Sequence, residues 1–300
     1  MDKKTIVVCG ATGNVGGAVV ESLLKKKIWK VIALTRKPDA PKAIALQDKG
    51  AKLLKADLQN RSSMITAFEG AQLVFGITQP FSSDYKKTDP DAEIQQGHNI
   101  IDSCVTNNIE HIVFSTVFGS GDHKTGVPHL DSKLTIVDYL KTTTLPYTIL
   151  KPASFMDNIG RKYFPVKTGY VKGFTDGDVK VPYISVADIG EFAAMAFEQK
   201  ECFRNVEINL MADLVSGNDI AKTLSRIRNG ETFKYKAMPR LLMKLFASEF
   251  YAMRVSFEKS GRPPYPPEYA EALQKCRDLR PDLINIEQFL ISQGYKVKQL

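Results

Sequence analysis

The sequence is poor in cysteine, and its four cysteines lie far apart at positions 9, 104, 202 and 276. They form neither a Cys-x-x-Cys pair nor the dense pattern of a disulfide-stabilised secreted domain. Long apolar runs are also missing, so we predict no membrane-spanning segment and no membrane partner. Met1-Asp-Lys-Lys leads directly into the first apolar run, so we expect no signal peptide. Together these absences favour a cytoplasmic protein with reduced thiols.

Acidic charge is also in short supply, because 41 Lys and Arg face 33 Asp and Glu, for a formal net charge of +8. The lysines are scattered and form no motif that reads nucleic acid. The short run Lys25–Lys27 falls at the end of a predicted helix, where cations interact favourably with the helix dipole. The charge pattern therefore argues against a nucleic-acid partner and is explained by solvated surfaces and an anionic cofactor.

The chain begins with a strand, a glycine-rich turn and a helix. Thr5–Cys9 is short, apolar and β-branched, and apolar residues recur at helical spacing over 15–24. Between them, Gly10–Gly16 has the spacing Gly-x-x-Gly-x-x-Gly. A helix N-terminus attracts phosphate, and glycine lets the backbone approach it closely. Such turns also occur without a ligand, but a second apolar strand, Val31–Leu34, follows at the distance that a dinucleotide site requires.

The residues after the second strand indicate which dinucleotide binds. An NAD site places an acid there, which accepts a hydrogen bond from the ribose 2′-hydroxyl, whereas an arginine accommodates the 2′-phosphate of NADP. The segment Thr35–Pro38 contains Arg36 and no acid. Arg36 could also be an ordinary surface residue beside a turn proline, but its position favours NADP(H) as the cofactor.

Strand and helix patterns alternate as far as Leu150. Further strands are predicted at 51–55, 73–77, 111–115 and 146–150, and helices at 41–49, 61–68 and 89–107. The alternation predicts an α/β fold with a Rossmann-like doubly wound parallel sheet. We expect residues 1–153 to form the NAD(P)-binding domain, with 185–210 returning to its sheet. Residues 154–184 and 211–300 should then form a smaller C-terminal α+β lobe.

The predicted lobe contains recognisable local patterns. Residues 170–181 have the pattern of a hairpin that turns at Asp176-Gly177. Residues 238–253 carry an apolar stripe at helical spacing, which is either core or a surface for a partner. Ser216 and Asn285 are each followed by a helical pattern, and we predict that they are N-caps.

The glycine spacing resembles that of the short-chain dehydrogenase superfamily, especially its extended and atypical branches. Typical members keep a serine where this chain has Ser115 and Thr116, and a tyrosine four residues before a lysine. The lysine ammonium and the cofactor ribose lower the pKa of that tyrosine, which then shuttles a proton. Here the segment runs from His129 to Lys133, so the lysine is present and histidine replaces the tyrosine.

His129 is one candidate proton donor, since the reference pKa of histidine, roughly 6.5, suits proton transfer. The alternative, which we favour, is a loop histidine beside Pro128, because no partner that would orient the ring is evident. The group of Asp122, His123, His129 and Asp131 matches no standard spacing of metal ligands, so we predict no metal site.

Several motifs together resemble the NmrA-like family of atypical short-chain dehydrogenases, namely Gly10–Gly13, Thr35-Arg36, Ala56–Leu58, Lys133 and Val186–Gly190. The resemblance spans nearly the whole chain and is most specific in the first half. It implies an α/β dinucleotide-binding fold, an NADP(H) cofactor and a set of contact residues.

The contacts implied by the resemblance follow the cofactor from one end to the other. The pyrophosphate is expected at Gly10, Ala11, Thr12, Gly13, Asn14 and Val15, and the adenosine phosphate at Arg36 and Lys37. The adenine is expected at Asp57 and Leu58, and the ribose near Ile77, Thr78 and Gln79. The nicotinamide is expected near Lys133, Ala153, Ser154, Phe155 and Met156. Asp57 could instead cap the following helix.

The resemblance leaves two functions open. The family includes NADPH-sensing regulators that bind protein partners, and also quinone and phenylpropanoid reductases. Histidine at the tyrosine position resembles the sensor branch more than the reductases. We therefore predict an NADP(H)-binding redox sensor with little or no dehydrogenase activity. The alternative is an NADPH-dependent reductase of a quinone or small carbonyl compound, in which Lys133 and His129 organise the proton.

Two further features are left undecided by the sequence. The polar residues Ser82, Ser83 and Asp84 either cover the site or only connect two elements. No pattern in the chain specifies an oligomeric state or names a regulatory partner or substrate.

Overall fold

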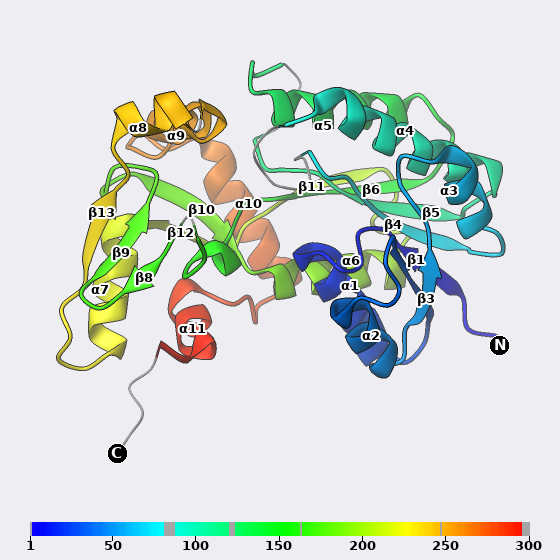
Figure 1. Ribbon diagram of the computed structural model, residues 1–300, viewed down its shortest axis with the longest axis horizontal. Coiled ribbons are helices and arrows are strands. Elements are labelled where there is room, and N and C mark those ends of the chain that lie inside the picture. Colours follow the sequence, from blue (N-terminus) through cyan, green and yellow to red (C-terminus); the bar gives the residue numbers. More distant parts are fainter. Residues whose placement is uncertain (1, 81–87, 120–123, 163, 247, 296–300) are drawn as a thin grey trace. The chain divides into compact units, whose positions relative to one another are not determined.

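The computed structural model describes residues 2–80, 88–119, 124–162, 164–246 and 248–295. Residue contacts divide the chain into two units, both drawn in Figure 1. Met1–Pro152 and Val186–Asn209 form the first unit, and Ala153–Ser185 and Leu210–Leu300 form the second. No helix in the described ranges is long and apolar enough to cross a membrane.

A seven-stranded sheet forms the centre of the first unit. Its strands are β1 (Thr5–Val8), β2 (Lys30–Thr35), β3 (Lys52–Lys55), β4 (Leu73–Ile77), β5 (His111–Ser115), β6 (Tyr147–Pro152) and β11 (Val206–Leu210). They are ordered β11-β6-β5-β4-β1-β2-β3, and the neighbours from β3 to β6 pair in parallel. β11 is parallel to β6 as well, because Asn205 N donates to Tyr147 O and Ala153 N donates to Leu210 O.

Helices cover both faces of this sheet (Figure 1). α1 (Asn14–Lys26), α2 (Pro41–Asp48) and α6 (Val186–Glu198) lie on one face. α3 (Arg61–Ala67), α4 (Pro90–Thr106) and α5 (Pro128–Lys141) lie on the other. Helices on both faces of a parallel sheet define a doubly wound fold, so the predicted Rossmann-like architecture is confirmed.

Close helix packing depends on two glycines. A Cβ at Gly190 of α6 would lie 2.6 Å from the carbonyl oxygen of Ala18 in α1. A Cβ at Gly97 of α4 would lie 2.5 Å from Ile136 Cγ1 in α5. The core beside α4 and α5 contains fully buried side chains such as Phe114, and each contributes about 1.5–3 kcal/mol relative to an exposed one.

The second unit contains two small sheets. β7 (Ser154–Phe155), β10 (Lys180–Ile184) and β12 (Asp213–Ser216) form one, in the order β12-β10-β7. β8 (Val166–Lys167), β9 (Tyr170–Gly173) and β13 (Lys234–Ala237) form the other, in the order β13-β9-β8. The helices are α7 (Gly217–Ile227), α8 (Arg240–Phe246), α9 (Ser248–Ser260), α10 (Pro267–Leu279), α11 (Ile286–Leu290) and the short helices Met156–Asn158 and Ile291–Tyr295.

The hairpin predicted at 170–181 is wrong. β9 pairs in parallel with β13, whereas β10 pairs antiparallel with β12 in the other sheet. The turn at Asp176-Gly177 does form, because Val179 N donates to Asp176 O at 3.2 Å, and Arg254 pairs with the Asp176 carboxylate. The local turn signal was therefore correct, but the strands on either side of the turn pair with partners from elsewhere in the chain.

The region 238–253 contains α8 and the start of α9, and residue 247 between them lies outside the described residues. Met243 of α8 is fully buried, but the leucines of the stripe on α8 are strongly exposed. The capping predictions fare better. Ser216 and Asn285 each form a capping box, in which the N-cap side chain accepts from the N3 backbone N–H and the N3 side chain accepts from the N-cap backbone N–H.

A buried histidine begins β5. His111 Nε2 lies 2.8 Å from Thr148 Oγ1 of β6, and that hydroxyl donates to the carbonyl oxygen of Phe203 at 2.8 Å. Since the hydroxyl hydrogen is used on Phe203, the imidazole donates through Nε2. Burial, together with the nearby Lys200 and Arg204, lowers the pKa of His111 from 6.5 to about 4.

This histidine should make the fold sensitive to mild acid. Between about pH 6.5 and 4 the unfolded chain binds a proton that the folded chain does not. The free energy of unfolding should therefore keep its full value above about pH 6.5. It should fall by about 3 kcal/mol as the pH approaches 4. His111→Gln keeps a donor but cannot titrate, so it should lose this part of the pH dependence. Urea unfolding at a series of pH values measures the free energy of unfolding of both proteins. The same dependence of this free energy on pH in both proteins would contradict the assignment.

Candidate functional site

The glycine-rich turn follows β1 where the strand order reverses. β1 pairs with β2 on one side and with β4 on the other, which is the switch point where open α/β sheets bind ligands. Gly10 has a φ of +61°, a left-handed conformation that favours glycine. Gly16 has no room for a side chain, because a Cβ there would lie 2.3 Å from Gly10 O. The turn therefore packs directly against the first turn of α1.

The N-terminus of α1 can receive an anion. The helix begins at Asn14, its N-cap Gly13 makes no side-chain hydrogen bond, and its first turn holds no acid. Its first N–H groups therefore keep their partial positive charge. Gly13 and Asn14 are exposed, Thr12 is half-buried, and Ala11 and Val15 are buried. Among the predicted pyrophosphate contacts, Gly13 and Asn14 at the start of the helix are thus the most open to solvent.

Arg36 and Lys37 follow β2 and are both exposed. Lys37 N donates to Thr35 Oγ1 at 3.1 Å, which orders the turn. Within the described ranges, the Arg36 guanidinium has neither a hydrogen bond nor an ion pair. Because β1 and β2 are parallel neighbours, this guanidinium stands at the same sheet edge as the glycine turn, with its donors available to a phosphate.

Asp57 and Leu58 follow β3 at the next strand end. Asp57 Oδ1 accepts from Gln59 N at 3.1 Å, so the carboxylate orders the loop. The N-cap of α3 is Asn60, whose side chain accepts from Ser63 N. The alternative role of Asp57 as a helix cap is therefore wrong, because the chain makes a further turn before the helix begins.

Ile77, Thr78 and Gln79 stand where β4 ends. Ile77 Cγ2 lies 2.8 Å from the position that a Cβ on Gly10 would take, so this side chain contacts the glycine turn directly. Thr78 is buried and Gln79 is exposed. The sheet therefore gathers the residues predicted from β1 to β4 along a single edge.

Lys133 lies in α5 in a buried ion pair with Glu93 of α4. Lys133 Nζ donates to Glu93 Oε1 at 2.7 Å, and Thr78 Oγ1 donates to the same oxygen at 2.7 Å. Ser132 Oγ donates to the other oxygen of the carboxylate. The fully buried carboxylate thus receives three donors, which compensate for its removal from water.

His129 lies four residues before Lys133 in α5, so the two share one face of the helix. Pro128 is the first residue of the helix, so His129 lies in its first turn. The His129 side chain is buried there. The prediction of a loop histidine is therefore wrong. Ser115 ends β5, and its buried hydroxyl has no hydrogen-bond partner among the residues that the structure describes.

Comparison with known proteins gives a family match along almost the whole chain. A model of the NmrA-like family matches residues 2–290. The chain belongs to the NmrA-like family. The match extends over both units, so the resemblance inferred from the motifs is confirmed.

This NmrA-like chain is similar to proteins that are named as oxidoreductases and to one that is named as a transcriptional regulator. It is 26% identical over 256 residues to the NmrA-like family domain-containing oxidoreductase notA of Aspergillus sp. (strain MF297-2), which spans 78% of this chain and 76% of the relative. The structure of NmrA, a negative transcriptional regulator, in complex with NADP covers 96% of this chain and 94% of that chain at 21% identity and a TM-score of 0.76. Triphenylmethane reductase of Citrobacter sp., complexed with NADP(H), covers 97% and 99% at 20% identity and a TM-score of 0.76. At such identities the two structures establish the fold alone.

Other residues that the sequence analysis singled out fall in the second unit or outside the described residues. Ala153–Met156 belongs to the second unit, where β7 pairs with β10 and the buried Met156 begins a short 3₁₀ helix. Ser82–Asp84 and the pair Asp122 and His123 lie outside the described residues.

Three polar side chains of α4 connect the strand ends, although the sequence pattern alone did not identify them. Glu93 binds Thr78 and Lys133 as described above. Gln96 Oε1 accepts from Gln79 N at 3.0 Å, and Asn99 Nδ2 donates to Leu58 O at 2.8 Å. Glu93, Gln96 and Asn99 are 0%, 9% and 1% exposed, at a spacing of three residues that places them on one face. The available signal was three polar residues at a spacing of three along a predicted helix, and we call these three residues the α4 stripe.

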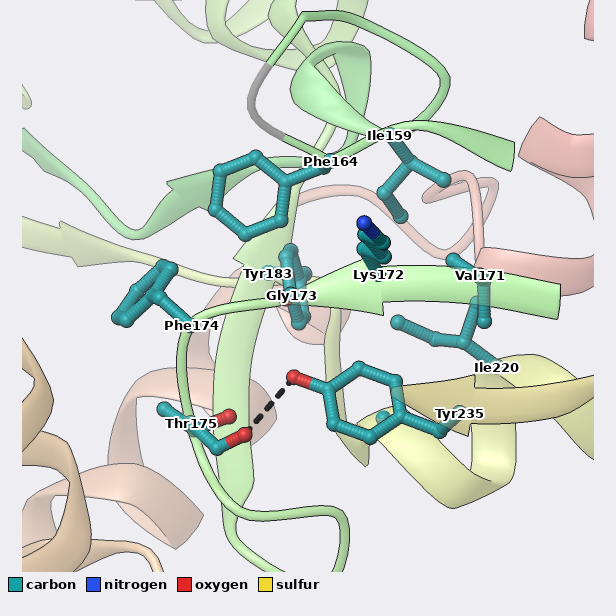
Figure 2. A pocket seen from close by; sticks show the side chains of 11 residues that line it. Ile159, Phe164, Val171, Lys172, Gly173, Phe174, Thr175, Tyr183, Ile220 and Tyr235 are labelled. Carbon is teal, nitrogen blue, oxygen red and sulfur yellow. Dashed lines mark hydrogen bonds between the residues drawn. The ribbon is translucent and has the colours of Figure 1, made fainter. Parts of the chain in front are cut away.

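Figure 2 shows a pocket within the second unit, lined by side chains that include Tyr183 and Tyr235. Tyr235 donates its hydroxyl to Thr175 O at 2.9 Å, and a Cβ at Gly173 or Gly217 would lie 2.3 Å from its atoms. Burial raises the pKa of Tyr183 above its ordinary value. The cavity measures about 10 Å³, which is room for about one water molecule. It is a gap in packing and too small for a substrate.

The ion pair of Glu93 should be essential for the stability of the first unit. Glu93→Gln leaves the buried Lys133 ammonium without its counter-charge, which we expect to cost about 3–5 kcal/mol. Removing both charges in Glu93→Gln/Lys133→Met should restore much of this loss. Glu21→Gln, which breaks the exposed pair with Lys49, should cost at most about 1 kcal/mol. Urea unfolding measures all three variants, and a loss in Glu93→Gln no larger than in Glu21→Gln would contradict the buried pair.

Proposed function

We propose that this chain binds NADP(H) and reports the redox state of that cofactor to a protein partner, with little or no dehydrogenase turnover. The observation that carries the proposal is the state of Lys133. Its ammonium lies 2.7 Å from the carboxylate of Glu93, which offsets its charge. A lysine ammonium that is paired with a carboxylate lowers the pKa of a neighbouring acid far less than an unpaired ammonium does. In addition, His129 occupies the position of the tyrosine that would need that help.

The assignment of NADP(H) rests on how the strand ends suit a dinucleotide. The glycine turn brings an uncapped helix N-terminus to the surface, which suits a pyrophosphate. The unpaired guanidinium of Arg36, with Lys37 beside it, suits the 2′-phosphate. We assign the adenine to Asp57 and Leu58, the ribose to Ile77, Thr78 and Gln79, and the nicotinamide to Lys133 with Ala153, Ser154, Phe155 and Met156.

A reductase is the second candidate, because notA is named an oxidoreductase and the Citrobacter protein a reductase. Bound NADPH would supply a hydride to a quinone or a small carbonyl compound. A quinone needs no dedicated tyrosine acid for this step, whereas an ordinary carbonyl usually does. His129 and the buried hydroxyl of Ser115 would then be the groups that hold a proton near the reacting atoms.

Arg36 should decide which cofactor is preferred. We expect NADPH to bind more tightly than NADH, and Arg36→Ala to weaken NADPH about tenfold to a hundredfold while leaving NADH unchanged, because a charge-assisted phosphate contact is worth about 1.5–3 kcal/mol. Calorimetric titration measures each affinity. Arg277→Ala removes an arginine from α10 in the second unit and serves as the control for net charge. Equal affinities in the unmodified chain would rule out this role of Arg36.

Turnover separates the two functions. A concentration of NADPH about one hundred times its dissociation constant should add about 2.7 kcal/mol to stability and raise the melting temperature by several degrees. The same preparation is then screened for NADPH oxidation with quinones, aldehydes and ketones, alongside Lys133→Ala and His129→Phe. A thermal shift without oxidation supports the sensor. Oxidation above about one turnover per second that either substitution abolishes identifies a reductase.

A further inference from the structure

One face of the sheet formed by β8, β9 and β13 is strongly basic. Lys234 is in register with Tyr170 and Lys236 with Lys172, while Lys167 is in register with Tyr170 from the other side. Side chains in register on neighbouring strands, and two residues apart along a strand, point to the same face. We call these four lysines around Tyr170 the basic face. All four lysines are exposed.

The charge of the basic face is not neutralised by the protein. None of its four lysines has an ion pair with a residue in the described ranges. The acids nearest to these strands along the chain, Asp176, Asp178 and Glu231, are already paired with Arg254, Arg262 and Arg228. The arginines therefore satisfy the local acids and leave four ammonium groups free to attract an external anion.

The aromatic ring in the basic face is covered by its own lysines. Lys236 Nζ lies 4.3 Å from the centroid of the Tyr170 ring, and Lys172 Nζ lies 5.8 Å from it. Single-stranded nucleic acids are typically held by bases stacked on free aromatic rings. Lys236 already occupies a position over this ring, so a stacked base would have to displace its ammonium group.

Next to the basic face, α8 exposes an apolar surface. Met238 N donates to Gly173 O at 2.8 Å, so β13 stays attached to β9 until two residues before the helix begins. Met243 anchors the helix and is fully buried, whereas Leu241, Leu242 and Leu245 are 69%, 49% and 65% exposed. Lys244 is exposed among these leucines. Exposed leucines interspersed with lysine are typical of helices that lie in a membrane interface.

We propose that the basic face and the leucines of α8 dock this chain on an anionic phospholipid surface. The lysines attract the headgroups, and the leucines enter the boundary with the acyl chains. This is peripheral binding, and it departs from the expectation of no membrane partner, which rested on the absence of long apolar runs. It depends only on the second unit and is independent of the cofactor.

Vesicle flotation of the full chain tests the proposal. The chain should float with vesicles of phosphatidylcholine and phosphatidylserine at low salt, and not with phosphatidylcholine alone. Lys234→Gln/Lys236→Gln should weaken binding about 25-fold, at about fivefold for each lysine. Lys30→Gln/Lys52→Gln changes two exposed strand lysines of the first unit by the same charge and should bind as the unmodified chain does.

A second pair of variants tests the apolar part of the surface. Leu241→Ser/Leu245→Ser should abolish the binding that survives at high salt, where the charge attraction is screened. Equal flotation with neutral vesicles, or equal weakening in both lysine pairs, would overturn the proposal. So would single-stranded DNA that binds the chain and displaces it from the vesicles. Light scattering without vesicles completes the test, because a dimer that these leucine substitutions dissociate would assign the leucines to a second copy of the chain.

Discussion

The buried carboxylate of Glu93 is the constraint on which the candidate site depends. A carboxylate removed from water is costly unless donors surround it, and this one draws Thr78, Ser132 and Lys133 to the same point. Those donors come from the end of β4 and from α5, while the carboxylate comes from α4. The two helices and the sheet edge therefore have to meet in one arrangement, and the closely packed Gly97 allows it.

The α4 stripe extends this constraint along the sheet edge. Asn99 holds the backbone at Leu58, and Gln96 holds the backbone at Gln79. Strand ends that would otherwise be mobile loops are thus attached to a rigid helix, which is how a binding site gains a defined geometry. The same scaffold suits a sensor and a reductase, so the function depends on the few groups at the proposed nicotinamide position and not on the fold.

Charge is distributed differently in the two units. In the first unit the ion pair of Glu93 and Lys133 is buried and fixes geometry, and the exposed Arg36 makes no ion pair with any residue that the structure describes. In the second unit arginines such as Arg254 neutralise the acids within the structure, while lysines remain on the surface. Arginine, with its planar fork of donors, suits the internal role, and the strongly hydrated lysine suits a surface that meets anions.

The sequence by itself determined the alternating elements of the first unit, the glycine turn and the position of Arg36, because these depend on local periodicity and backbone freedom. Membership of the NmrA-like family followed from the same local motifs. Only the tertiary structure decided that Tyr170–Gly173 pairs with β13, that His129 is buried in a helix, and that Lys133 is joined to Glu93, 40 residues away in the chain. Such pairings depend on which apolar faces and buried charges meet after folding, and no local pattern encodes that choice.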